Sequence, residues 1–176
     1  GKMAAAITRG VQSHRRKAVT IKHFAANNQE TNRNASNSVV SERALREIYL
    51  KGFEICVREA SPKAVMSSYN LVNGEHTCQI KDLQTHVLRD EWGFDGFVMT
   101  DWSVTKGLAK GDKKYPVACA SGIVKAGNDM TMPGNRNDVM DILKALEDQR
   151  HPYSITRAQL QLSAKRILST ILSMCI

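Results

Sequence analysis

Four short runs of hydrophobic residues recur along the chain. Each is followed by a polar or glycine-containing segment and then by a longer stretch with helical spacing. The runs cover residues 18–24, 64–69, 96–101 and 128–132. They are rich in Val, Ile, Met, Phe and Tyr and are too short for an average helix, so they predict buried β-strands. Alternation of such strands with helices is typical of a parallel α/β fold.

The stretches between the runs carry the apolar spacing of helices. In the first stretch Ser41 is a suitable N-cap, and Pro62 ends the helix. Spacings of three and four predict one buried face, made of Leu45, Ile48, Tyr49, Gly52, Phe53 and Cys56. Further helices are predicted over residues 80–92, with Leu83, Val87 and Leu88 inward, and over 116–126, 139–147 and 156–174, the last capped by Thr156.

Polar residues end each predicted strand, at Lys22-His23, Tyr69-Asn70, Asp101-Trp102 and Pro133-Gly134. Four strand–helix units fit either half of a (β/α)₈ barrel or a small open sheet, and periodicity alone does not separate the two. Barrel active sites lie at the C-terminal ends of the strands, so polar strand exits favour the barrel. We therefore expect an α/β fold of four βα units with parallel strands. This partial (half) TIM barrel would be completed by self-association or by missing parts of a longer protein.

Charge and hydropathy exclude several classes of protein. The chain has 176 residues, 42% of them hydrophobic, and a formal net charge of +8, which is a globular composition. The positive charges are scattered except at residues 14–17, which we interpret as a solvated loop or helix end rather than a nucleic-acid patch. No apolar run approaches the roughly 20 residues of a membrane helix. We expect neither a nucleic acid nor a membrane as partner.

The cysteines and the first residues bear on cofactors and location. Cys56, Cys78, Cys119 and Cys175 are far apart and form no CxxC pair, so we expect no metal site, no cofactor and no disulfide framework. Free thiols fit a reducing compartment. The first ten residues lack the pattern of a signal peptide, and together these features lean toward the cytoplasm without fixing the location.

Asp101 is the candidate for covalent chemistry. It directly follows an apolar strand, which would hold its carboxylate rigidly at the mouth of the sheet. A carboxylate placed there can attack the anomeric carbon of a sugar or act as a general base. The neighbouring Trp102 can pack on the C–H face of a sugar. Taken alone, such an aspartate is more often a loop cap or an ion-pair partner.

Lys22 and His23 end the first predicted strand and can hydrogen-bond vicinal hydroxyls. A solvent-facing lysine beside a structural histidine is an equally good interpretation. Arg33 and Tyr69 would join them, since a barrel brings all of its strand ends together.

The loop after the first strand carries side-chain amides and a carboxylate, Asn27-Asn28-Gln29-Glu30. Amides suit polyol recognition because each one both donates and accepts hydrogen bonds. They suit ordinary loop capping as well, which is the commoner use. Glu30 as the second carboxylate of a glycosidase pair is the less favoured hypothesis.

Five strings, read in order, resemble the family-3 glycoside hydrolases of the β-glucosidase and β-xylosidase group. They are KHFAANNQE at 22–30, SERALREIYL at 41–50, VMSSYN at 65–70 followed by NG, LRDEWGFDGFVMTDW at 88–102 and AGNDMTMPG at 126–134. One such string is weak support, whereas five in order at suitable spacing are strong. The resemblance implies the C-terminal half of the catalytic barrel.

The resemblance also implies roles for individual residues. The aspartate of the family's SDW string is the nucleophile of a retaining mechanism, and it corresponds to Asp101. The residues that would bind the sugar are Lys22, His23, Arg33, Met66, Tyr69 and Trp102. The N-acetylglucosaminidase branch carries KHFPGHG, whereas this chain has Ala-Ala-Asn-Asn at residues 25–28, which disfavours that branch.

The resemblance further implies that residues 1–176 form a partial barrel domain. The first half of the barrel and the second domain, which usually supplies the acid/base glutamate, are absent from it. The expected function is part of a retaining β-glycosidase acting on terminal β-linked glucose or xylose, with the isolated chain nearly inactive. The alternative is a non-catalytic sugar-binding or self-associating half-barrel. Half a barrel leaves sheet edges and an inner apolar face uncovered, so a homodimer or a large exposed apolar face is expected.

Overall fold

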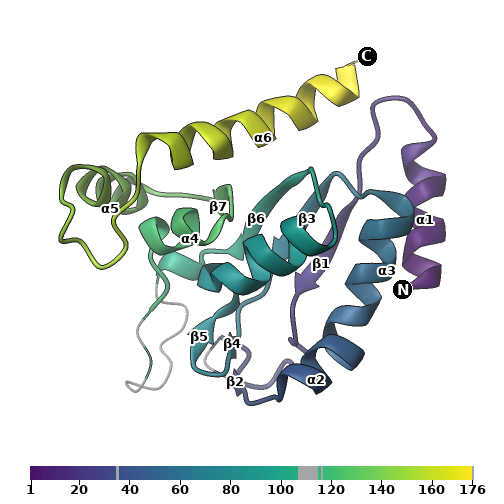
Figure 1. Cartoon of the computed structure of the whole chain (residues 1–176), viewed down its shortest axis with the longest axis horizontal. Helices are drawn as coiled ribbons and strands as arrows, with labels where there is room; N and C mark the ends of the chain where they lie inside the picture. Colours follow the sequence, from purple (N-terminus) through teal and green to yellow (C-terminus); the bar gives the residue numbers. More distant parts are fainter. Residues whose placement is uncertain (35, 107–114, 116, 176) are drawn as a thin grey trace.

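A parallel sheet forms the centre of the computed structural model, which describes residues 1–34, 36–106, 115 and 117–175 (Figure 1). Its strands are β1 (Thr20–Phe24), β3 (Ala64–Ser67), β6 (Phe97–Trp102) and β7 (Met130–Met132), in the order β1-β3-β6-β7. The helical elements are α1 (Lys2–Gln12), α2 (Glu42–Ala44), η1 (Leu45–Leu50), α3 (Lys51–Ala60), η2 (Thr77–Gln79), η3 (Asp82–Glu91), η4 (Val104–Lys106), α4 (Ala120–Ala126), α5 (Arg136–Glu147) and α6 (Arg157–Cys175).

All three pairings within this sheet are parallel. Met66 of β3 is in register with Met99 of β6, and Met99 in turn with Met130 of β7. The four predicted strands and their parallel arrangement are therefore confirmed. Their first residues begin up to two positions later than the hydrophobic runs.

One face of the sheet is covered by helices, and the described residues cover the other face only in part. Along β6, Val98 and Thr100 are fully buried, whereas Phe97, Met99 and Asp101 on the opposite face are only partly buried. Since successive side chains of a strand point to opposite faces, the second set lies on the inner side of the partial barrel. The candidate nucleophile thus shares its face with an incompletely covered apolar layer.

The first predicted helix is continuous from Glu42 to Ala60 but has a wide π-helical turn at η1. Ser41 caps it as predicted, its Oγ accepting from the amide of Ala44. The prediction that Ile48 faces the core is wrong, since Ile48 is 67% exposed, whereas Leu50 is buried. The wider turn rotates the positions after Leu45 relative to an ordinary helical spacing of 3.6.

The later helices follow the predictions with shifted ends. In η3, Leu83, Val87 and Leu88 are buried as predicted. Helix α4 begins at Ala120, and residue 116, where the prediction began, lies outside the described residues. Helix α5 begins three residues earlier than predicted, because the Asn135 side chain caps it. At α6, the Thr156 hydroxyl accepts from the amide of Gln159, as expected of a cap.

Two features were not predicted from the sequence. Helix α1 packs against α3 through Ala5 and Thr8, next to Cys56. A second, small sheet with the order β2-β4-β5 joins β2 (Asn37–Ser38), β4 (Leu71–Val72) and β5 (Glu75–His76). It ties the loop after β1 to the loop after β3, both of which lie at the end of the sheet that carries Asp101.

The four cysteines are free thiols, and those of Cys56 and Cys78 are buried. Burial raises the pKa of the Cys78 thiol to about 12. Within the described residues, no cluster of metal-ligating side chains occurs. No helix in the described part of the chain has the length and apolar character to cross a membrane.

Candidate active site

Asp101 lies near the C-terminal end of β6, with its carboxylate at the rim of the sheet. One oxygen, Oδ1, accepts from the backbone amide of Trp102 at 2.6 Å. Thr100, the preceding residue, ties β6 to β7, because its hydroxyl accepts from the amide of Met132 at 2.9 Å. The carboxylate is thus fixed by its own strand and is only 13% exposed.

His23 is the nearest sequence-predicted partner of Asp101. Its Nε2 lies 3.3 Å from Asp101 Oδ2, although β3 separates their strands in the sheet. The expectation that the two residues share one rim is therefore confirmed. Burial lowers the pKa of His23, the charge of Asp101 opposes this shift, and the cations Lys22 and Arg33 add to it. The imidazole is neutral at pH 7, so it has one donor and one acceptor nitrogen for hydrogen bonds with a hydroxyl.

Tyr69 and Arg33 occupy the same rim. The Tyr69 hydroxyl donates to the backbone carbonyl of Trp102 at 3.0 Å, and the Arg33 guanidinium lies 4.9 Å from the centroid of the Tyr69 ring. Burial, and then the charge of Asp101, raise the pKa of Tyr69, so it remains a neutral donor. Trp102 is 53% exposed at the end of β6.

Met66 completes the set of sequence-predicted residues. It pairs in register with Met99, which lies two residues before Asp101 and therefore on the same face of β6. Met66 thus lies one step below the carboxylate on the inner side of the sheet, where an apolar atom can contact a bound ring. The structure brings the sequence-predicted residues together at one end of the sheet; Lys22 is among them, next to His23 on β1.

Two other carboxylates near the strand ends are already paired. Glu30 is 80% exposed in its side chain and forms an ion pair with Arg33 at 2.8 Å. Asp129, which precedes β7, is fully buried in its side chain and lies 2.6 Å from Arg89 and 3.1 Å from Arg166. These contacts leave Asp129 inaccessible to a substrate.

The cluster of Asp129 with two arginines was not predicted, although a charged residue at the start of an apolar run is its signal. Asp129 Oδ2 also accepts from the amide of Val98, so the cluster ties β6 to η3 and α6. Burial lowers the pKa of Arg89 to about 10, and Asp129 opposes that shift. Arg89 therefore remains charged at pH 7.

The side-chain amides of the loop after β1 line a cavity of about 320 Å³. Asn27, Asn28 and Gln29 line it together with Asn37 and Tyr49. None of the sequence-predicted sugar-binding residues lines this cavity, so these amides form a separate polar surface beside the rim.

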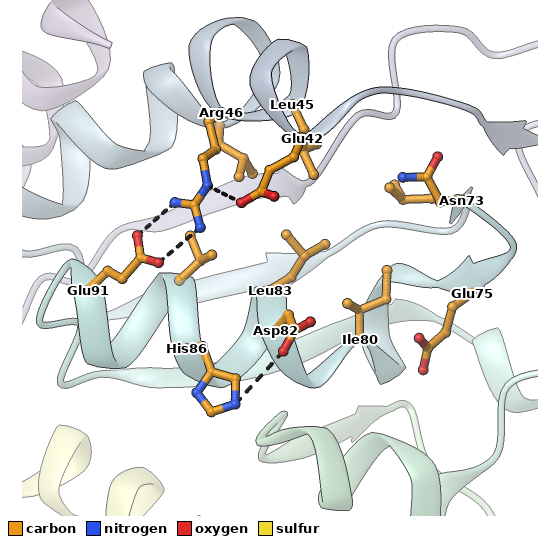
Figure 2. A pocket seen from close by; sticks show the side chains of 13 residues that line it. Glu42, Leu45, Arg46, Asn73, Glu75, Ile80, Asp82, Leu83, His86 and Glu91 are labelled. Carbon is orange, nitrogen blue, oxygen red and sulfur yellow. Dashed lines mark hydrogen bonds and ion pairs between the residues drawn. The ribbon is translucent and has the colours of Figure 1, made fainter.

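A larger cavity of about 430 Å³ lies on the helical side of the sheet (Figure 2). Two of its carboxylates pair with Arg46, which bonds Glu91 through two nitrogens at 2.7 and 3.0 Å and Glu42 at 2.9 Å. These bonds raise the pKa of Arg46 and lower that of Glu91. No rim residue contributes to this cavity, so it is not the site around Asp101.

Comparison with known proteins identifies the family of the chain. The model of the glycosyl hydrolase family 3 N-terminal domain matches residues 1–170. A β-glucosidase of Ruminococcus albus is 47% identical over 98% of this chain, and an exo-α-(1→6)-L-arabinopyranosidase of Bifidobacterium longum is 54% identical over 58%. The chain spans only 18% and 13% of the lengths of these two proteins.

A solved structure shows the same fold. β-Glucosidase 3B of Thermotoga neapolitana in complex with glucose superposes with a TM-score of 0.83 at 40% sequence identity. The match covers 98% of this chain and 23% of that protein. The partial barrel and the family resemblance are thereby confirmed, and the chain belongs to glycosyl hydrolase family 3, within its N-terminal domain.

Proposed function

We propose that this chain is part of a retaining β-glycosidase that hydrolyses terminal β-linked glucose or xylose, with Asp101 as the nucleophile. The observation that carries the proposal is the placement of the Asp101 carboxylate, 3.3 Å from His23 at the rim where the sequence-predicted sugar-binding residues meet. The β-glucosidase names of the relatives support the sugar class.

In the first step, a carboxylate oxygen of Asp101 attacks the anomeric carbon while the glycosidic C–O bond breaks. The departing oxygen takes a proton from an acid, and the sugar remains bound to Asp101 as an ester. Lys22, His23 and Arg33 bind the sugar hydroxyls, and Met66 contacts the ring from below. Interactions that strengthen as the anomeric carbon flattens favour the transition state over the bound substrate.

In the second step, water attacks the anomeric carbon and releases Asp101. The former acid, now a base, accepts the proton of that water. A retaining enzyme needs this second group about 5–5.5 Å from the nucleophile. We propose that the acid/base residue comes from outside these 176 residues, since Glu30 and Asp129 are both held in ion pairs. The isolated chain would then be nearly inactive.

The proposal is tested in a protein that joins these residues to the remainder of a family-3 enzyme. A 2-fluoro glucoside should label Asp101, as read by peptide mass spectrometry. Asp101→Ala should lower kcat by on the order of 10⁴–10⁶-fold, and azide or formate should partly restore turnover. The exposed Asp95→Ala is the matched control and should remain active. Labelling of Glu30 or Asp129, or normal turnover of Asp101→Ala, would refute the assignment.

A second proposal concerns assembly, because the inner face of the sheet is incompletely covered. Phe97 and Met99 are only partly buried there, and β1 and β7 form the two edges of the four-stranded sheet. Open edges and apolar faces favour pairing with another chain. We propose that the isolated chain forms a homodimer through this face. A non-catalytic, self-associating half-barrel is the alternative function that the same observation favours.

A further inference from the structure

The segment that follows His23 is held by polar groups of the loop after the neighbouring strand β3. Phe24, Ala25 and Ala26 are buried, and Ala26 has a left-handed backbone with φ 59°. Their three carbonyls lie in a region with little solvent, so each needs a donor from the protein. These donors come from the loop after β3 and from Ser38.

Ser68 serves the first two carbonyls. Its amide donates to Phe24 O at 3.0 Å, and its hydroxyl donates to Ala25 O at 3.1 Å. The same hydroxyl lies 2.9 Å from that of Thr77, which donates to the carbonyl of Ser68 at 2.7 Å. The hydroxyls therefore form one connected buried group.

Asn70 serves the second and third carbonyls. It is fully buried, and its Nδ2 lies 3.3 Å from Ala25 O, 3.2 Å from Ala26 O and 3.1 Å from the carbonyl of Leu71. Carbonyls only accept, so the amide orientation is fixed with its NH₂ group toward them. Within the described part of the chain, Asn70 Oδ1 has no hydrogen-bond partner, so the donor end supplies the side-chain hydrogen bonds of this residue.

We propose that Asn70 is a positioning residue that holds His23 against Asp101 by clamping the backbone at Ala25 and Ala26. The clamp is two to three residues from His23, and the Phe24 side chain anchors the same segment in the core, 5.1 Å from the ring of Phe53. An imidazole at the rim thus takes its position from a side chain of the adjacent strand end. The catalytic meaning of this arrangement rests on the proposed function, but the geometric claim does not.

The test measures the coupling between His23 and Asp101 in the full chain by NMR. The pKa of His23 is measured in the chain with Asp101 and in the Asp101→Asn variant. The difference between these two pKa values, called the coupling below, reports how close His23 lies to Asp101. The charge of Asp101 raises the pKa of His23, so Asp101→Asn should lower it. Lys22, Arg33 and Glu30 also act on this ring and are present in both members of each pair.

Asn70→Asp replaces the donor by an acceptor of the same shape and should reduce this difference to less than about half of its wild-type size. Asn73→Asp is the matched control, because Asn73 Nδ2 donates to Val40 O at 2.9 Å in a segment away from His23. It should leave the coupling unchanged. An unchanged coupling in folded Asn70→Asp would overturn the proposal.

If Asn70→Asp does not fold, Asn70→Ser decides the question, since its hydroxyl retains one donor. If Asp101→Asn shifts the pKa of His23 less in Asn70→Ser than in wild type, the proposal is supported. A shift of wild-type size overturns it. The measurement needs no turnover. Failure of sugar labelling at Asp101 with the coupling intact would therefore sink the proposed function alone.

Discussion

At the residue scale, the rim around Asp101 combines one carboxylate with neutral and cationic donors. His23 is partly buried and has a lowered pKa, so it is neutral where Lys22 and Arg33 are charged. The polar strand exits predicted that Lys22, His23, Tyr69 and Asp101 meet, whereas Met66 was added only by the family resemblance. The buried donors behind them, Ser68 and Asn70, were not predicted to position anything, because amides and hydroxyls in loops are common and only coordinates show what they face.

Acid should destabilise the chain partly through His23. Because its folded pKa lies below the ordinary 6.5, the unfolded chain binds this proton more readily. The stability that neutral His23 provides is present above about pH 6.5 and is lost as the pH falls through the folded pKa. We expect urea midpoints of His23→Gln to fall less steeply between about pH 7 and 5 than those of wild type. The exposed His14→Gln should follow wild type, and equal slopes for all three proteins would contradict the prediction.

Removing the charge of Asp129 should cost far more stability than removing a surface charge. Asp129→Asn leaves the buried Arg89 and the partly buried Arg166 next to a neutral group, and breaking a buried ion pair typically costs about 3–5 kcal/mol. Chemical denaturation measures this loss. Glu47→Gln, which removes an exposed pair with Arg43, should be close to wild type. Similar losses in both variants would refute the argument.

At the element scale, the strands were predictable because continuous apolar runs signal strands of a parallel sheet. Helix α1 was not, since Ala5 and Thr8 form its buried positions while Met3 and Ile7 are exposed. Its apolar pattern therefore does not mark the buried face. The small sheet was missed because strands of two residues, such as Leu71–Val72, carry no periodicity. The π-helical turn at η1 misled the assignment of Ile48.

The C-terminal end of α4 depends on a glycine. Gly127 has φ 97°, and a Cβ there would lie 2.4 Å from Thr85 Oγ1. We expect Gly127→Ala to lower the free energy of unfolding by about 1–3 kcal/mol through strain and the clash.

Gly10→Ala in α1 is the matched control for that change, because no described atom beyond the backbone of its own helix lies within 4 Å of the added Cβ. It should raise stability by about 0.5–1 kcal/mol, as expected for alanine in a helix interior. Thermal or urea denaturation measures both changes. If both variants changed the free energy of unfolding in the same direction, the backbone conformation of Gly127 would not control the end of α4.

At the scale of the whole molecule, the described part of the partial barrel has a packed helical side and an incompletely covered inner side. The fold class was predictable because four similar units recur along the chain. Its completion was not, since sequence periodicity carries no information about what covers the inner layer. The chain spans 18% of the length of the Ruminococcus albus β-glucosidase and 23% of the length of the Thermotoga neapolitana enzyme. In such a protein the inner layer would be shared with other segments.

Self-association of the isolated chain should depend on concentration and on the inner face. Sedimentation velocity should show a dimer that dissociates on dilution, with an interface above about 1,000 Å². Phe97→Asp and Met99→Asp should shift the equilibrium toward monomer, since a charge would have to be desolvated on pairing. Val39→Asp, at an 83% exposed position outside the four-stranded sheet, is the control. A compact monomer at all concentrations would contradict the prediction.

The cluster around Asp129 has a consequence for the order of folding during synthesis. Asp129 Oδ2 finds Arg89 and Val98 among residues that leave the ribosome first, but Oδ1 contacts Arg166, which emerges 37 residues later. Until then, the half-paired carboxylate that precedes β7 would lie in a forming core, which opposes the packing of this strand. We expect the last strand to dock late, and nascent chains stalled before Arg166 to leave the β6–β7 pair open to protease.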